Sequence, residues 1–291
     1  MGDEDYPSSP ASPRITPEEA RLLWEVVESH CGLSYSFGTA SYLERRALPR
    51  LRALGLGSFR EYFLHLRYGE SREQELGILI EQLTNHETYF FRERYQLEAF
   101  RLEVLPQLVT LRRQYRLLNV WSAGCSTGEE AYTVAMLLSD APELEGWNYR
   151  VFGTDISQPV LRKARAGVYG PSSFRTTTDE ERARYFVEEG KRWAVRDEIR
   201  ARTAFGHLNL LQQDKLHLMG ACDAIFCRNV LIYLSAAARA EVVETFYDRL
   251  RPGGVLMLGH SESLLNVSTR FEILNLEQDL VYQKPREDDD G

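Results

Sequence analysis

Apolar residues in the first third of the chain recur at helical spacing. Thr16 and Glu19 form the pattern of a capped helix start, and the apolar positions that follow lie one helical turn apart, at Leu22, Leu23, Val26 and Val27. Further helical patterns cover residues 41–54, 58–68 and 72–83, with glycines between them. The spacing predicts a small all-helical domain over residues 15–83, followed by a linker and a bridging helix over residues 84–115.

From residue 116 onward the pattern changes to short apolar runs that alternate with helical segments. The runs predict strands over residues 117–123, 149–154, 223–227 and 255–259, helices over 158–166 and 235–250, and a final antiparallel pair, 271–274 and 280–283. This alternation predicts an α/β fold over residues 116–284, with a mostly parallel, Rossmann-like sheet covered by helices on both faces. Residues 168–204 fit neither pattern and are expected to form an inserted subdomain.

Composition and charge restrict the function classes. The 291 residues are 43% hydrophobic and 27% charged, which is typical of a globular protein. The formal net charge is −8, and two acidic tails, residues 1–14 and 285–291, hold much of the excess. The Pro- and Ser-rich first tail is expected to be disordered. Because the remaining body is close to neutral, we exclude a nucleic-acid partner, which would require a more basic chain.

Neither a membrane nor a metal is expected to be involved. The chain has no apolar run long enough for a bilayer span, and its acidic start does not fit a signal peptide, so no membrane insertion is expected. Four scattered cysteines form no CxxC pair and no zinc pattern. We therefore expect a cytoplasmic protein with free thiols and no metal.

The most informative segment is NVWSAGCSTGEEAY, where Gly124 and Gly128 allow a tight turn after the predicted strand that ends at Ala123. Its G-x-x-x-G spacing departs from the G-x-G-x-x-G dinucleotide motif. Two carboxylates, Glu129 and Glu130, follow in the first turn of the predicted helix. They would repel a pyrophosphate but suit an ammonium and a sulfonium, which favours S-adenosylmethionine over NAD. An ordinary structural turn is the alternative.

Polar residues follow the other predicted strands as well. Asp155 ends the second strand, where an acid can accept hydrogen bonds from ribose hydroxyls, although a helix cap would explain it too. Arg228 and Asn229 follow a later strand, and Tyr233 lies shortly after them. Arg92 lies at the junction with the helical domain, where a cation could meet a carboxylate substrate. Open α/β sheets bind ligands at this carboxyl edge.

Six motifs occur in a characteristic order: TNHETYFFRER, WSAGCSTGEEAYT, GTDIS, FCRNVLIYL, LRPGG and GHSES. On these motifs the sequence resembles the CheR-type chemotaxis receptor methyltransferases over residues 16–284. The resemblance implies a helical domain joined to a Rossmann-like S-adenosylmethionine domain with a small inserted β-subdomain. It also implies an activity, the methylation of glutamate side chains on the cytoplasmic helices of chemoreceptors, which yields methyl esters and S-adenosylhomocysteine.

The resemblance further implies roles for single residues. Cofactor contacts fall on His86, Thr88, Arg92, Ala123, Gly124, Glu129 or Glu130, Asp155, Asn209, Leu210, Arg228 and Asn229. Tyr233 matches a tyrosine near the transferred methyl group, and Arg92 is expected to steer the incoming carboxylate, so these two are the candidate catalytic residues. His86 stands where the family has an asparagine, which leaves open whether Asn85 or His86 faces the cofactor. For the acid near the amino group of the cofactor, the resemblance favours Glu130 over Glu129.

Residues 40–72 contain seven arginines and three glutamates. Such a run is ordinarily a solvated helix face, but the resemblance makes it a candidate docking surface for acidic receptor helices, with Arg45, Arg46, Arg50 and Arg52 as its members. The segment 186–196 is shorter than in relatives that tether to a receptor's C-terminal pentapeptide, so we expect no tether.

Other functions stay open at this point. The chain could methylate a carboxylate on a different signalling protein, or it could be a catalytically silent sensor that binds the cofactor. An NAD-dependent oxidoreductase is disfavoured by the two glutamates and the missing dinucleotide motif. We expect a monomer.

Overall fold

The computed structural model describes residues 13–34, 39–216 and 219–286, and the chain divides into two compact units, Met1–Thr84 and Asn85–Gly291. Most of the expected N-terminal tail lies outside the described residues, as do residues 287–291 of the acidic C-terminal tail. The described end of the first tail is held by an ion pair, in which Arg14 Nη1 lies 3.2 Å from Glu44 Oε1.

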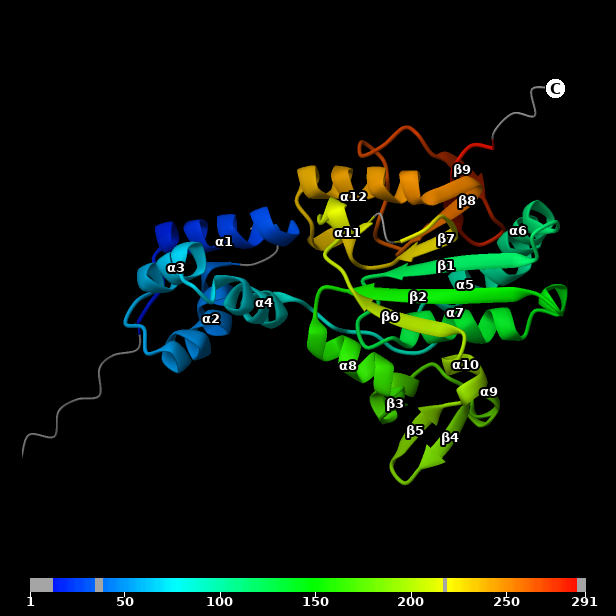
Figure 1. Ribbon diagram of the computed structural model, residues 1–291, viewed down its shortest axis with the longest axis horizontal. Coiled ribbons are helices and arrows are strands. Elements are labelled where there is room, and N and C mark those ends of the chain that lie inside the picture. The colour runs from blue at the N-terminus through cyan, green and yellow to red at the C-terminus, as the bar shows by residue number, and fades with distance from the viewer. Residues whose placement is uncertain (1–12, 35–38, 217–218, 287–291) are drawn as a thin grey trace, which may run out of the picture. The chain divides into compact units, whose positions relative to one another are not determined.

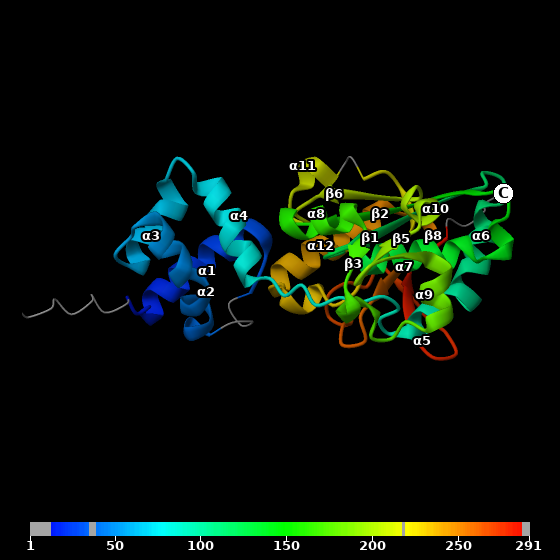
Figure 2. The ribbon, with the colours of Figure 1, turned by 90° about the horizontal axis from the view of Figure 1, so that it is seen from below.

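The first unit is all-helical, as the spacing predicts (blue to cyan in Figures 1 and 2). Its helices are α1 (Pro17–Cys31), α2 (Ala40–Leu54), α3 (Phe59–Tyr68) and α4 (Arg72–Leu83). The predicted cap of the first helix is confirmed, because the Thr16 and Glu19 side chains each accept a backbone N–H of the other residue. Apolar side chains from all four helices, among them Leu23, Leu43 and Leu79, form its buried core.

The second unit is built on a seven-stranded sheet in the order β6-β2-β1-β7-β8-β10-β9 (Figure 1). The strands are β1 (Leu117–Ala123), β2 (Asn148–Asp155), β6 (Thr203–His207), β7 (Cys222–Cys227), β8 (Leu250–Leu258), β9 (Glu272–Asn275) and β10 (Leu280–Gln283). The first five are parallel, and β10 and β9 are added antiparallel at one edge. The predicted α/β fold class is confirmed.

Two strands differ from the prediction. β6 lies at the opposite edge of the sheet and is only half-buried, so its sequence TAFGH carries no continuous apolar run, and part of it falls in the segment assigned to the insertion. β8 begins at Leu250 rather than at residue 255, because the turn residues of the LRPGG motif already belong to the strand.

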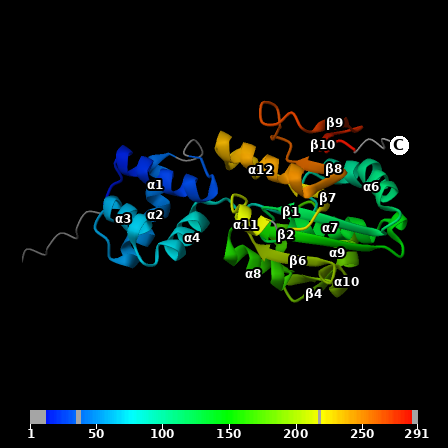
Figure 3. The ribbon, with the colours of Figure 1, turned by 45° about the horizontal axis from the view of Figure 1, so that its top comes forward.

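Helices cover both faces of this sheet (Figure 3). One face packs against α7 (Glu129–Ser139) and α6 (Leu105–Arg112), and the other packs against α12 (Ala236–Arg249) and α11 (Gln213–Leu216). The bridging helix consists of α5 (Arg94–Ala99) and a π-helical turn (Phe100–Val104), which continue into α6. α8 (Gln158–Ala166) follows β2. None of the helices in the described ranges is both long enough and apolar enough to cross a bilayer.

The inserted segment forms a small antiparallel sheet in the order β3-β5-β4, from β3 (Val168–Tyr169), β4 (Phe186–Glu189) and β5 (Arg192–Val195). Two short helices, α9 (Asp179–Tyr185) and α10 (Asp197–Arg200), flank the β4–β5 hairpin. The described part of the second unit also contains the 3-10 turns Pro142–Leu144, Pro171–Phe174 and Leu231–Tyr233. Aromatic rings join the insertion to the segment before the large sheet, because Phe90 packs against Phe174 and Phe186 with ring centroids 5.3 and 4.8 Å apart.

Candidate functional site

The sheet reverses its direction of growth between β1 and β7. From β1 the chain adds β2 and then β6 on one side, and it returns to place β7 on the other side. In open α/β sheets, loops at such a point leave in opposite directions, and ligands bind between them at the carboxyl ends of the strands, the region that we call the crevice. Gly124 occupies the turn after β1 with a φ of 74°, and a Cβ there would lie 2.5 Å from a methyl of Val230 in the loop after β7. The two loops therefore meet so closely that only glycine fits.

Asp155 lies at the carboxyl end of β2 and is nearly fully buried. Each of its carboxylate oxygens accepts one backbone N–H, from Ser126 at 2.8 Å and from Ser157 at 2.9 Å. Burial raises the pKa of Asp155, against these two N–H groups and the nearby His86 and His207. Because each oxygen keeps a lone pair, the side chain can hold two turns in place and still accept ligand hydroxyls. The helix-cap interpretation is wrong, because the N-cap of α8 is Ser157, and the ribose-binding role stays a prediction.

Glu130 and Arg228 form the charged centre of the crevice. Arg228 Nη1 lies 3.6 Å from Glu130 Oε2, and Ser122 donates its hydroxyl to the other Glu130 oxygen at 2.7 Å. Burial raises the pKa of Glu130, and the guanidinium of Arg228 opposes that shift. Arg228 is itself held by Gln96 Oε1 and Glu93 Oε2, each at 3.0 Å.

The neighbouring Glu129 points elsewhere. Its carboxylate accepts hydroxyl hydrogen bonds from Thr127 at 2.6 Å and from Ser173 of the inserted segment at 2.8 Å, and the residue is 2% exposed. Burial raises the pKa of Glu129, against those two hydroxyls. The pair therefore divides its work: Glu129 attaches α7 to the insertion, and Glu130 meets the arginine of the crevice.

The segment that carries His86, Thr88 and Arg92 runs along the same loops. Ser126 donates its hydroxyl to the His86 carbonyl at 3.1 Å, and Asn85 donates its amide to the Tyr233 hydroxyl at 3.4 Å. Thr88 is half-buried. Asn85 thus contacts the candidate catalytic tyrosine, and His86 contacts the glycine-turn loop through its backbone.

Among the described residues, Arg92 donates one hydrogen bond from its guanidinium. Its Nη1 donates to the Glu87 carbonyl at 3.0 Å, and the guanidinium lies 5.8 Å from the centre of the Tyr89 ring. The backbone beneath it is fixed by the insertion, because Phe90 N donates to the Ser173 carbonyl at 2.9 Å and Thr176 donates its hydroxyl to the Phe90 carbonyl at 2.8 Å. The inserted subdomain therefore supports the segment that carries Arg92.

Asn209 and Leu210 follow β6, next to the end of β2. The register pairs Asp155 with His207, and Leu208 N donates to the Asp155 carbonyl at 3.1 Å. Asn209 is buried and accepts the Leu211 N–H on its side-chain oxygen. Leu210 is half-buried against the apolar cluster on the α12 face. The structure thus brings this pair to the same sheet edge as Asp155.

Glu262 is a functional candidate that was not predicted, although it lies in the GHSES motif. Its two carboxylate oxygens accept four backbone N–H groups, those of Asn229, Val230, Ile232 and Gly259, at 2.7 to 3.2 Å. Asn229 has a left-handed backbone, with a φ of 62°. The GHSES motif was the available signal, but the partners of Glu262 are backbone groups, which a sequence does not display.

The crevice suits a ligand that carries an ammonium, hydroxyls and hydrogen-bond donors. Glu130 and Asp155 offer carboxylate acceptors, and the side-chain oxygen of Asn229 is buried with no partner among the described residues. An unpaired buried acceptor is costly and is typical of a site that a ligand completes. Within the described ranges, no cluster of three or more His, Cys, Asp or Glu side chains could hold a metal, and all four thiols are free and buried.

The arginines of the proposed docking surface divide into two groups on α2. Arg45, Arg46 and Arg52 are exposed. Arg50 instead forms a two-point ion pair with Glu75, at 2.9 and 2.6 Å, beneath the hydroxyl of Tyr62. Arg50 is therefore engaged in holding α2 against α4, and its guanidinium is less available to a partner than the other three.

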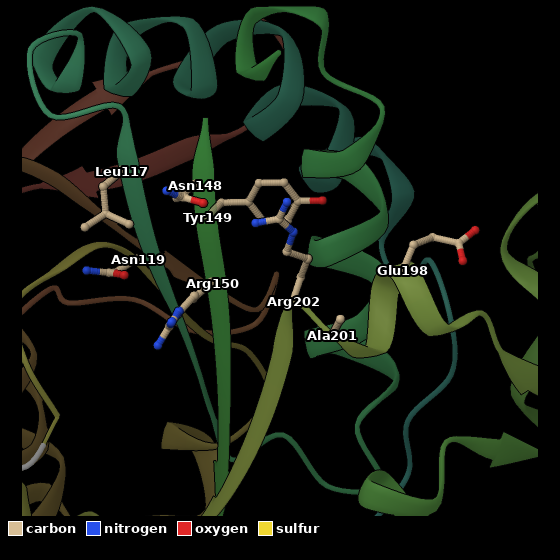
Figure 4. Close-up of a pocket in the computed structure, with 8 residues that line it drawn as sticks. All are labelled: Leu117, Asn119, Asn148, Tyr149, Arg150, Glu198, Ala201 and Arg202. Atoms are coloured by element: carbon tan, nitrogen blue, oxygen red, sulfur yellow. The ribbon is translucent and has the colours of Figure 1, made fainter. Parts of the chain in front are cut away.

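A large surface hollow of about 650 Å³ lies at the amino ends of the strands, opposite to the candidate site (Figure 4). Its lining comes from the amino ends of β1 and β2 and from the segment before β6, and includes Asn119, Arg150 and Arg202. None of the candidate cofactor residues lines it. A search for the cofactor site by cavity volume alone would therefore select the amino ends of the strands, away from the candidate residues.

Comparison with known proteins assigns the chain. Residues 18–84 match the CheR methyltransferase all-alpha domain, and residues 86–280 match the CheR methyltransferase SAM binding domain. The chain belongs to the CheR methyltransferase family. It is an S-adenosylmethionine-dependent methyltransferase of chemotaxis, and S-adenosyl-L-methionine is its cofactor, with S-adenosyl-L-homocysteine as the product.

Individual CheR relatives match nearly the whole chain. Chemotaxis protein methyltransferase 2 of Vibrio cholerae is 37% identical over 256 residues, which cover 87% of this chain and 88% of that protein. The chemotaxis protein methyltransferase of Salmonella typhimurium is 34% identical and covers 87% of this chain and 86% of its own. Among solved structures, the N-methyltransferase NodS from Bradyrhizobium japonicum with bound S-adenosyl-L-homocysteine covers 68% of this chain and 89% of that chain at 13% identity, with a TM-score of 0.39, a likeness too distant to carry any argument.

Proposed function

We propose that this protein methylates glutamate side chains on the cytoplasmic helices of methyl-accepting chemoreceptors, forming glutamyl methyl esters, and that it works in the cytoplasm. Two hydrogen bonds of the segment that carries Arg92 support the proposal: the Arg92 carbonyl accepts one from Arg228, the partner of Glu130, at 2.5 Å, and Asn85 donates one to the Tyr233 hydroxyl at 3.4 Å. The family membership and the chemotaxis relatives support the same substrate class.

The chemistry asks little of the protein in proton transfer. The bound cofactor supplies an electrophilic methyl group on a positively charged sulfur. A glutamate substrate is ionised near neutral pH, since the ordinary pKa of a glutamate side chain is about 4.3, so no general base is needed. The residues of the site therefore act by orientation and electrostatics.

Each candidate residue then has a defined task. Glu130 accepts the cofactor's ammonium, Asp155 accepts its ribose hydroxyls, and Arg228 holds Glu130 in place and opposes the rise of its pKa. Arg92 has donors beyond the one given to Glu87, and it steers the substrate carboxylate. Tyr233 fixes the geometry around the methyl group. Neither should grip the carboxylate tightly, because an ion-paired carboxylate is a weaker nucleophile.

The product distinguishes this proposal from other methyl transfers. The protein is incubated with methyl-labelled S-adenosylmethionine and chemoreceptor-containing membranes, and the washed membranes are then treated with base. We expect label on a receptor-sized band and its release as volatile methanol, which identifies an ester. Base-stable label would contradict the proposal, and base-labile label on a different protein would shift the target. Single-turnover transfer that is unchanged in both Arg92→Ala and Tyr233→Phe would contradict the residue roles.

Substrate docking is proposed to use the exposed arginines of α2, which complement acidic receptor helices in charge. Docking is further proposed not to depend on a receptor's C-terminal pentapeptide, because the β4–β5 hairpin is short. Receptors with and without that pentapeptide should then be methylated at equal rates under limiting enzyme. A several-fold loss on truncation would show that the hairpin tethers after all.

A further inference from the structure

Glu262 closes the loop that follows β7 onto the loop that follows β8. One carboxylate oxygen accepts the N–H groups of Asn229 and Gly259, at 2.7 and 2.8 Å, and the other accepts those of Val230 and Ile232, at 2.9 and 3.2 Å. Three of these donors belong to one short stretch of chain, which curls around the carboxylate as backbone nests curl around anions. A single side chain thus fixes four backbone groups from two loops.

The Glu262 carboxylate and its four N–H partners, which we call the Glu262 clamp, are closely packed at Gly259. A Cβ at Gly259 would lie 2.7 Å from the side-chain nitrogen of Asn229 and 2.9 Å from a Glu262 oxygen. Asn229 is held at a φ of 62°, a left-handed conformation that costs a non-glycine residue free energy. The hydrogen bonds that the Glu262 carboxylate accepts offset that cost, so the loop conformation depends on Glu262.

The clamped loop ends in the 3-10 turn Leu231–Tyr233, which carries the candidate catalytic tyrosine. Arg228, at the other end of the same loop, has its own partners in Gln96, Glu93 and Glu130. Loosening the clamp should therefore displace Tyr233 while the ammonium end of the cofactor site stays in place.

We propose that Glu262 is a positioning residue for methyl transfer, which acts through the backbone of residues 229–232 to hold Tyr233 against the reacting centre. This inference rests on the proposed role of Tyr233. It differs from a general stabilising role because it assigns the effect to the rate of transfer within the bound complex, with little effect on cofactor affinity.

The variant Glu262→Gln keeps the shape of the side chain but turns an NH2 group toward two of the four N–H donors. We expect single-turnover transfer, measured in the full-length protein with receptor membranes and saturating S-adenosylmethionine, to fall about 10- to 100-fold. The dissociation constant for S-adenosylhomocysteine, measured by calorimetry, should change less than about threefold. Gly259→Ala enters the same clamp from the other side and should give the same split, which covers the case in which Glu262→Gln folds poorly.

Asp223 provides the matched control. It is a buried carboxylate of the same sheet that also accepts a backbone N–H, from Asn119 at 2.8 Å. It lies at the amino end of β7, far from the candidate site, between Arg112 and Arg251. Asp223→Asn should lower the melting temperature without lowering the rate of transfer in the remaining folded protein. An equal loss of rate in Asp223→Asn would reduce Glu262 to a stabilising residue.

A double-mutant cycle with Tyr233→Phe separates the two proposals. If Glu262 acts through Tyr233, the double variant should be no slower than the slower single variant. Fully additive losses would overturn the inference while leaving the role of Tyr233 intact. If Tyr233→Phe alone has no effect, the proposed role of Tyr233 fails, and the inference fails with it. A wild-type rate in both Glu262→Gln and Gly259→Ala, with a slow Tyr233→Phe, would overturn the inference alone.

Discussion

The guanidinium of Arg228 lies 3.6 Å from the carboxylate of Glu130, which joins the loop after β7 to the first turn of α7, the helix that follows β1. Arg228 is 7% exposed, and Glu93 is its second acidic partner. When both carboxylates are ionised, they carry one more negative charge than the single buried guanidinium neutralises. A cationic ligand would balance that charge. The adjacent glutamates 129 and 130 can therefore be tested as a matched pair.

Glu130→Gln should weaken the binding of S-adenosylhomocysteine at least about tenfold, or about 1.4 kcal/mol, because a neutral amide replaces the acceptor of the cofactor's ammonium. Glu129→Gln is the control, since its carboxylate bonds Thr127 and Ser173. We expect Glu129→Gln to lower the melting temperature with less than about threefold change in affinity. Calorimetry and thermal unfolding measure both quantities, and the reverse ranking would assign the cofactor to Glu129.

Asp155→Asn should weaken cofactor binding by about tenfold as well, because the amide keeps one acceptor but turns its NH2 toward the N–H of Ser126 or Ser157. Some loss of stability should accompany it, since both turns depend on the carboxylate. Undiminished affinity in calorimetry would exclude Asp155 from the ribose site.

Cofactor binding should release protons below neutral pH. Burial raises the pKa values of Glu130 and Asp155. At a pH between the ordinary and the raised pKa values, the folded protein therefore holds protons that the unfolded chain has released. The free energy of unfolding falls as the pH rises through this range. A ligand that donates to the ionised forms lowers both pKa values again. Calorimetry with S-adenosylhomocysteine at about pH 5.5, in two buffers of different ionisation enthalpy, should report release, and Glu130→Gln should reduce it. Proton uptake would contradict this assignment.

Reversing the charge of Arg45 and Arg46 to Glu should raise the KM for receptor membranes several-fold, leave the affinity for S-adenosylhomocysteine unchanged, and lose most of its effect at high salt. The double reversal of the exposed Arg113 and Arg116 changes the net charge equally and serves as the control. Equal effects of the two double variants would mean that overall charge matters and that α2 does not dock.

Arg50→Ala tests a different property, the stability of the helical unit. Removing this guanidinium leaves the carboxylate of Glu75, which is 3% exposed, with the hydroxyl of Tyr62 as a hydrogen-bond donor but without a cation. We expect a loss of about 3 kcal/mol in the free energy of unfolding, at the low end for a buried pair because Arg50 is partly exposed. Arg46→Ala, which gives up a contact with the Tyr42 ring, should cost less than about 1 kcal/mol. Chemical denaturation compares the two, and similar losses would show that the Arg50–Glu75 pair contributes little.

Much of the fold follows from local sequence, and the limits are equally physical. The cap at Thr16 and the apolar strands at the centre of the sheet depend on residues that are close together in the sequence, so they were predictable. β6 was not, because an edge strand needs no continuous apolar run. Parallel strands end at one edge of the sheet, so the places of Asp155 and Arg228 at that edge were predictable, and their contacts with the cofactor stay predictions.

Side-chain direction and backbone partners could not be predicted in the same way. Glu129 and Glu130 are adjacent on a helix, so they point about 100° apart, and their directions depend on where α7 begins. Likewise, the four partners of Glu262 are backbone amides that any residue could supply. The role of Arg50 depended on Glu75, which lies on another helix.

The hydrogen bonds of Phe90 to Ser173 and Thr176 change how the insertion should be regarded. An inserted subdomain is ordinarily a module that relatives can exchange or discard. Here it supports the candidate site, because Ser173 and Thr176 hold the backbone of Phe90, two residues before Arg92, by hydrogen bonds. A chimaera that exchanges residues 168–204 between family members should therefore keep its activity only if residues 84–94 are transferred with them.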